Sequence, residues 1–201
     1  MTQIAVDVVL LPSQKLMDKA IEANRELSKQ HPNKIILDKE NCLPHISLAM
    51  GCIDRKDIAD IEKILRETAE KYRTGPLHVT GVHIEKNSAG EKVSVLQIKK
   101  TETLQLLHEQ IMHKLVDFFN NEVTADMILS DTPVGESTLL WIKNYSGKSS
   151  FGNFFPHITL GYGEIENRFS LTKFTVSKLA LCHLGNHCTC RKVLATAELT
   201  A

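Results

Sequence analysis

A short phrase occurs twice in this sequence, once in each half of the chain. Residues 43–48 read LPHISL and residues 155–160 read FPHITL, so proline, histidine, isoleucine, a hydroxyl residue and leucine follow one another in both. Successive side chains of a β-strand point to opposite faces, which puts a histidine and the residue two positions later on one face. If both copies are strands, each presents an imidazole beside a hydroxyl, with two apolar side chains behind them. The repeat therefore predicts a chain made of two similar lobes.

The hydrophobic pattern predicts both helices and strands around the two copies. Helical spacing of apolar residues begins after Ser13, Asp54 and Thr101, and each of these residues can cap a helix. Alternating or continuous apolar runs predict strands, at residues 4–11, 34–38, 45–51, 77–86, 92–99, 139–143, 157–162, 174–184 and 189–199. Several of these strands are joined by hairpins, which give antiparallel sheets. The expected class is α+β, with mainly antiparallel sheets and outer helices.

The composition is that of an ordinary globular protein. The 201 residues suit a single domain, residues 1–201, made of two lobes, and 42% hydrophobic residues are enough for a core. Lysine plus arginine (24) equals aspartate plus glutamate (24), so no global field attracts nucleic acid or membranes, and a phosphate site must be local. We recognise no signal peptide and no membrane-spanning run, and five scattered cysteines favour reduced thiols. We therefore expect a cytoplasmic protein with no membrane partner.

Two histidines on facing strands form the central chemical hypothesis. Imidazole has an unperturbed pKa of about 6.5, so His45 and His157 can act as general base and general acid without a metal. The pattern leaves open which of them is the acid. Displacement at phosphorus suits such a pair, because one histidine takes a proton from the attacking water and the other protonates the leaving oxygen. Ser47 and Thr159 are the candidate donors of hydrogen bonds to the phosphate oxygens.

Neighbouring positions add further candidates for substrate binding. Ala49 and Gly161 follow the hydroxyls on the same predicted face, and their small size is expected to leave the floor of a cleft open. Phe155 lies two residues before the second histidine, where an aromatic ring can stack on a base or ribose. Lys143 is a candidate to bind the phosphate through its positive charge. It precedes residues 145–153, a segment rich in glycine and serine that is predicted to be a loop covering the site.

The two phrases together resemble the paired H-x-(S/T) motifs of the 2H phosphoesterase superfamily. This group includes the 2'-5' RNA ligases, cyclic phosphodiesterases and a nucleotide-binding domain of a kinase-anchoring protein. The resemblance implies two pseudo-symmetric lobes of antiparallel sheet that flank a central groove, with one motif in each lobe. It also implies metal-independent hydrolysis, or reversible ligation, of 2',3'-cyclic or 2'-5' phosphodiesters of a nucleotide or an RNA terminus. Ser47 departs from the usual pattern, since threonine is the commoner residue there.

Three other histidines receive a plainer interpretation. Residues 78–80 read HVT in a predicted strand, but no proline precedes His78 and glycine follows the threonine. We interpret His78 as an ordinary strand residue. His108 and His113 lie on or beside the polar side of the third predicted helix, where we expect them to be solvated.

Two rival functions stay open. A groove with the same residues can hold a nucleotide without turnover, as a non-catalytic binding module. The cysteines and histidines at residues 182–190 suggest a metal-dependent interaction site, but their spacing matches no standard zinc motif, and cysteines near strand ends are more often buried apolar residues. We expect no metal, no other cofactor and no obligatory protein partner.

Overall fold

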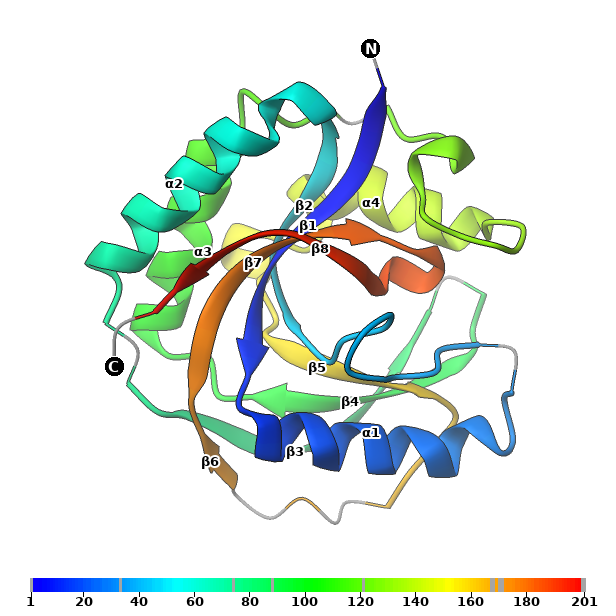
Figure 1. Ribbon diagram of the computed structural model, residues 1–201. Helices are drawn as coiled ribbons and strands as arrows, with labels where there is room; N and C mark the ends of the chain where they lie inside the picture. The colour runs from blue at the N-terminus through cyan, green and yellow to red at the C-terminus, as the bar shows by residue number, and fades with distance from the viewer. Residues whose placement is uncertain are drawn as a thin grey trace.

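The computed structural model describes residues 2–32, 34–73, 75–87, 89–120, 122–166, 169 and 172–199. Within these ranges the strands form two four-stranded antiparallel sheets, shown in Figure 1. The first sheet contains, in spatial order, β2 (Ile46–Asp54), β1 (Gln3–Pro12), β7 (Val176–Leu184) and β8 (Cys190–Glu198). The second contains β5 (His157–Tyr162), β4 (Lys92–Ile98), β3 (Leu77–Lys86) and β6 (Thr172–Phe174). The α+β class and the two lobes of antiparallel sheet are confirmed.

Four α-helices cover these sheets within the described residues. They are α1 (Gln14–Ser28), α2 (Ile58–Lys71), α3 (Glu102–Leu115) and α4 (Glu136–Lys148). Two of them cross between the lobes: α1 follows β1 of the first sheet but packs on β5 of the second, and α3 follows β4 of the second sheet but packs on β2 of the first. In Figure 1, α2 and α3 lie side by side at the left. The crossed helices interlock the two halves of the chain.

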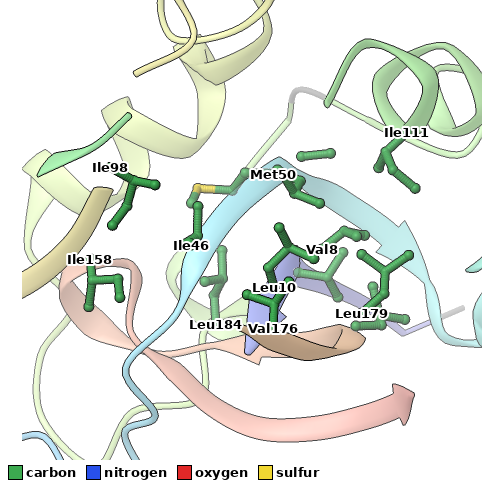
Figure 2. Close-up of a cluster of buried hydrophobic side chains, with 14 of the residues drawn as sticks. Val8, Leu10, Ile46, Met50, Ile98, Ile111, Ile158, Val176, Leu179 and Leu184 are labelled. Atoms are coloured by element: carbon green, nitrogen blue, oxygen red, sulfur yellow. The ribbon is translucent and has the colours of Figure 1, made fainter. Parts of the chain in front are cut away.

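The two motif strands occupy equivalent positions in their sheets. Both β2 and β5 are edge strands, and they lie next to each other where the two sheets meet. The predicted apolar anchors behind the motifs are fully buried, with 0% exposure at Ile46, Leu48, Ile158 and Leu160. Figure 2 shows Ile46 and Ile158 within one buried cluster that both lobes share. Burial of these anchors fixes which face of each strand the histidines occupy.

Asn24 of α1 joins three separated segments through one buried side chain. Its Nδ2 donates to the carbonyl oxygens of Leu160 at 2.7 Å and Ile35 at 2.9 Å, and its Oδ1 accepts from Leu37 N at 2.8 Å. The strand predicted at residues 34–38 is therefore wrong. These residues satisfy their backbone groups on a helix side chain instead of on a neighbouring strand.

Gly161 lies directly against this asparagine. Its backbone has φ +144°, and a Cβ there would lie 2.9 Å from Asn24 Nδ2. Gly161→Ala is expected to lower the free energy of unfolding by about 2 kcal/mol, because strained backbone and a close contact are introduced together. Gly147→Ala is the matched control: nothing lies within 4 Å of a Cβ at this helical position, so stability should rise by about 0.5 kcal/mol. Urea unfolding of both variants measures the difference, and equal effects would contradict this account of Gly161.

The segment before the second motif differs from the prediction. Residues 139–143 belong to α4 and not to a strand, and most of the predicted loop at 145–153 is the end of α4 followed by the short helix η3 (Phe151–Asn153). The reason is a helical spacing of buried side chains, at Thr138, Ile142 and Tyr145. A run of apolar residues at 139–142 conceals that spacing, because short apolar runs fit either type of element.

The other predicted boundaries are confirmed only in part. Thr101 caps α3 as predicted, accepting from Leu104 N at 3.2 Å, whereas neither Ser13 nor Asp54 forms a side-chain cap. Strand β2 continues through Gly51 instead of ending there. A Cβ on that glycine would lie 2.7 Å from the ring of Phe119, so the small residue gives space to an aromatic ring.

Two cysteines are not the free thiols that the sequence predicted. Cys182 of β7 and Cys190 of β8 form a disulfide with a Cα–Cα distance of 5.5 Å, while Cys42, Cys52 and Cys188 are free. The count of cysteines cannot reveal that a hairpin places two of them opposite each other. The cytoplasmic location and the single-domain organisation stay predictions. No helix in the described part of the chain has the length and apolar character needed to cross a membrane.

Candidate active site

A cavity of about 380 Å³ lies between the two motif strands, a volume in the range of small-ligand sites. Its lining includes both histidines of the repeated phrase, His45 and His157, and both hydroxyl residues, Ser47 and Thr159. Phe155 lines it as well. The structure thus brings five of the six predicted site residues together from opposite halves of the chain.

The two imidazoles are held in the same way. His45 Nδ1 lies 2.7 Å from the carbonyl oxygen of Leu43, and His157 Nδ1 lies 2.8 Å from that of Phe155, in each case two residues earlier. A carbonyl can only accept, so each Nδ1 donates its hydrogen. In the neutral form each Nε2 therefore carries a lone pair, ready to accept a proton from a substrate.

Burial lowers the pKa of both histidines, but their charged neighbours differ. Burial is the main reason that the pKa of His45 falls to about 4, and the nearby His157 lowers it further. The pKa of His157 is also lowered by burial, while the negative charge of Glu85 opposes that shift. The charged neighbours thus disfavour a proton on His45 and favour one on His157, which makes the pair electrostatically unequal.

The two hydroxyls are unequal too. Ser47 Oγ and Oδ2 of Asp7 form a hydrogen bond at 2.6 Å, and Asp7 is a fully buried residue of β1 whose Oδ2 lies 3.8 Å from His45 Nε2. The hydroxyl of Thr159 has no hydrogen-bond partner among the described residues. The Thr159 hydroxyl is free to donate into the cavity, whereas the Ser47 hydroxyl is already hydrogen-bonded to the buried Asp7.

Each motif strand contains a β-bulge one residue after its hydroxyl. Leu48 is the extra residue of β2 against β1, and Leu160 is the extra residue of β5 against β4. An extra residue reverses the alternation of faces beyond it. As a result Met50 and Tyr162, each three residues after its hydroxyl residue, line the cavity.

The bulges overturn the expectation for Ala49 and Gly161. Ala49 is 0% exposed in the core, and the Cβ position of Gly161 faces Asn24 of α1. Neither residue lines the cavity. The larger side chains of Met50 and Tyr162 take the places where the simple alternation predicted an open floor.

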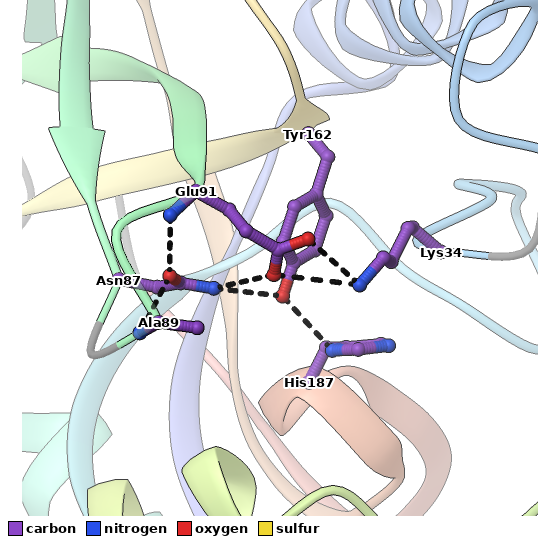
Figure 3. A network of polar contacts seen from close by, with 6 residues as sticks. All are labelled: Lys34, Asn87, Ala89, Glu91, Tyr162 and His187. Atoms are coloured by element: carbon purple, nitrogen blue, oxygen red, sulfur yellow. Dashed lines mark hydrogen bonds and ion pairs between the residues drawn. The ribbon is translucent and has the colours of Figure 1, made fainter.

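Figure 3 shows a polar network of which three residues, Asn87, Tyr162 and His187, line the cavity. The Tyr162 hydroxyl lies 3.0 Å from His187 Nδ1 and 3.5 Å from Asn87 Nδ2. Lys34 is paired with Glu91 at 3.0 Å and lies 4.7 Å from the centre of the Tyr162 ring. His187 belongs to η4 (Asn186–Cys188), between two strands of the first sheet, so the network ties the second motif strand to the opposite lobe.

His108 is not solvated as predicted; it is fully buried. Its Nδ1 donates to the carbonyl oxygen of Leu48 at 2.6 Å, its Nε2 accepts from Phe151 N at 2.7 Å, and its ring stacks on Phe154 at 4.1 Å. It lies four residues after the buried Leu104, within the apolar stripe of α3. His108 therefore links the first motif to the segment that leads into the second. His113 is exposed, as expected.

The remaining sequence candidates lie away from the chemistry. Lys143 is exposed on α4 and is not part of the cavity lining; the lysine that lines it is Lys86. His78 is half-buried on β3 and also lies outside the lining. Among the described residues no group of three or more histidine, cysteine, aspartate or glutamate side chains is arranged to hold a metal ion. Two of the hairpin cysteines are paired with each other, so they are not ligands.

Sequence reasoning missed several residues of the site. Trp141 of α4 is 49% exposed at the cavity, and Tyr145 of the same helix lines it while being buried. Both were hidden by the wrong assignment of their segment. Asp7 did carry a signal, because it is the one charged residue in the apolar run at 4–11. A charged residue in a buried strand is expensive unless it has a partner or a role.

Comparison with known proteins shows the fold. No family model matches the sequence, and no curated protein sequence matches it. The protein TT0787 of Thermus thermophilus matches with a TM-score of 0.62 at 14% identity, over 98% of each chain. A phosphoesterase matches with a TM-score of 0.50 at 15% identity, and E. coli LigT in complex with 3'-AMP with a TM-score of 0.52 at 15% identity, both over 100% of each chain. The chain thus has the fold of LigT and of a phosphoesterase, as its resemblance to the 2H phosphoesterases predicted.

Proposed function

We propose that this protein is a metal-independent phosphoesterase of the 2H type, which hydrolyses or reversibly ligates 2',3'-cyclic or 2'-5' phosphodiesters of nucleotides or RNA. The observation that carries the proposal is the pair His45 and His157. His45, just before β2, and His157, at the start of β5, both line one cavity, with both Nδ1 atoms held by backbone carbonyls. Two bases that come from different sheets and line one cavity suit an in-line displacement at phosphorus.

The proposed reaction assigns one step to each of these residues. His45, neutral through its low pKa, takes a proton from a water molecule as the water oxygen attacks phosphorus. The bond from phosphorus to the leaving ribose oxygen breaks, and His157 gives that oxygen its proton. A cyclic 2',3'-phosphodiester becomes a phosphomonoester, and the proton gained by His45 returns to His157 through solvent. The free hydroxyl of Thr159 donates to a phosphate oxygen on which negative charge increases.

The unequal histidines predict a bell-shaped dependence of kcat/KM on pH. As the base, His45 works only when deprotonated, so activity should rise with pH around a midpoint of about 4. As the acid, His157 works only when protonated. Because its pKa is lowered, activity should fall again at a pH below about 6.5, the ordinary histidine value. Initial rates from pH 3.5 to 8 at subsaturating substrate measure both limbs; a rising limb near the ordinary value would contradict the assignment of His45 as base.

The cavity supports a nucleotide-sized substrate. Trp141 is a large exposed ring at the cavity, and Phe155 presents a second ring stacked against His157 with centroids 5.3 Å apart. An aromatic side chain that stacks on a base contributes about 1–3 kcal/mol to the free energy of binding. E. coli LigT, which shares the fold, is known in complex with 3'-AMP and with ATP, so we infer that a nucleotide occupies this cavity too.

A panel of substrates tests the proposal. It contains the four 2',3'-cyclic nucleotides and short 2'-5' and 3'-5' linked oligonucleotides, each incubated with purified protein and a chelator. Turnover of cyclic or 2'-5' substrates, and none of 3'-5' ones, is the expected result. Tight binding without product would favour the non-catalytic binding module instead.

A further inference from the structure

Asp7 is a buried carboxyl directly behind the first hydroxyl of the site. It lies on β1, where its register partners are Met50 on β2 and Cys182 on β7, and none of its surface is exposed. An ionised carboxylate is costly in such a position unless a cation balances it. The groups around Asp7 therefore decide its charge.

Among the residues that the structure describes, no group that faces Asp7 supplies a positive charge at neutral pH. His45, from the loop before β2, is the one basic group within 4 Å among the described residues, at 3.8 Å, and it is neutral above a pKa of about 4. Tyr145 of α4 and Cys188 of η4 interact with Asp7, and burial raises the pKa of both, so they stay neutral. Cys182 is held in a disulfide.

We propose that Asp7 is a neutral carboxylic acid that donates its hydrogen to Ser47 Oγ and so turns the Ser47 hydrogen toward the cavity. The 2.6 Å between the two oxygens fits donation in either direction, because a protonated carboxyl is a donor. Asp7 Oδ1 has no hydrogen-bond partner in the described part of the chain, and a carbonyl oxygen tolerates that better than a carboxylate oxygen. Burial raises the pKa of Asp7 well above its usual range and outweighs the hydrogen bonds to Ser47 and to the Ala49 backbone, which lower it; this supports the neutral form.

The inference rests on the proposed phosphoesterase function, in which Ser47 and Thr159 hold the phosphate. Thr159 donates unaided. Ser47 donates to the substrate only while its hydrogen is not taken by Asp7, which requires Asp7 to be protonated. An ionised Asp7 would take the Ser47 hydrogen and repel the phosphate anion, so substrate binding should weaken as Asp7 loses its proton. Asp7 is in this sense a positioning residue that acts through Ser47.

Two substitutions separate a donor from a space-filling residue. Asp7→Leu removes the group that orients the Ser47 hydrogen, and kcat/KM on a 2',3'-cyclic nucleotide is expected to fall about 30-fold, less than when a whole donor to a developing charge is lost. Asp7→Asn restores a donor that cannot ionise. The kcat/KM of Asp7→Asn should be about tenfold higher than that of Asp7→Leu, and its KM should no longer rise with pH. If Asp7→Asn is as poor as Asp7→Leu while both keep the wild-type circular dichroism, the donor role is wrong.

A second measurement needs no turnover, so it decides the charge of Asp7 even if the proposed function fails. A carboxyl with a raised pKa in the folded state binds more protons than in the unfolded state, where its pKa is about 3.9. Above that pH the wild type should lose stability relative to Asp7→Asn, with an unfolding constant that grows by up to about tenfold per pH unit until Asp7 ionises. Urea unfolding of both proteins from pH 4 to 8 gives the difference. A flat difference, or one of the opposite sign, shows a carboxylate and overturns the proposal.

Discussion

Replacing either histidine of the repeated phrase by alanine is expected to lower kcat/KM on a 2',3'-cyclic nucleotide by about a thousandfold, the usual worth of general acid–base catalysis. His45→Ala removes the group that takes the proton of the attacking water, and His157→Ala removes the group that protonates the leaving oxygen. Neither histidine is expected to replace the other, because each imidazole is held in its own orientation by a hydrogen bond from Nδ1 to a separate backbone carbonyl. Steady-state rates of the purified variants give the values.

The sequence itself provides a matched control for this experiment. His78 also begins an H-x-T triplet on a strand, but it lies outside the cavity lining. His78→Ala should keep the wild-type rate. The two-histidine mechanism is wrong if His78→Ala lowers kcat/KM as much as His45→Ala does. It is also wrong if either active-site variant retains full activity with intact circular dichroism.

The second large effect is expected at Thr159. Thr159→Val keeps the shape and burial of the side chain but removes the one motif hydroxyl that is free among the described residues. We expect kcat to fall about 100-fold with a smaller change in KM, because the hydrogen bond strengthens as charge develops on the phosphate oxygens.

Thr80 supplies the control for this substitution. It is the hydroxyl of the HVT triplet, exposed on β3, and its Oγ1 donates to the Gln97 carbonyl at 3.2 Å. Thr80→Val should leave kcat unchanged. Equal losses in Thr80→Val and Thr159→Val would mean that threonine on these strands matters for structure and not for the reaction.

Much of the fold could be predicted because its signals are local. The alternation around His45 and His157 places the imidazoles on one face and Ile46 and Ile158 behind them, and both isoleucines are fully buried as expected. The hairpin between β3 and β4 follows from two alternating runs around a short turn. Period and turn residues are properties of neighbouring residues, which a single sequence contains.

The errors arise where distant parts of the chain decide local structure. The bulges at Leu48 and Leu160 depend on pairing with β1 and β4, so the alternation predicted the wrong residues beyond each hydroxyl. His108 looks polar in isolation, yet it is buried because Leu48 and Phe151 satisfy both of its nitrogens. The role of Asp7 likewise appears only when β1 pairs with β2.

The central claim is that one cavity, with two histidines and no metal, breaks a phosphodiester. The most direct measurement is product formation by the wild-type protein from 2',3'-cyclic AMP in the presence of EDTA, followed by chromatography, at a pH between the two limbs of the activity profile. The proposal predicts one adenosine monophosphate isomer, formed at the same rate with and without the chelator. No product over a long incubation, or activity that EDTA abolishes, would contradict it.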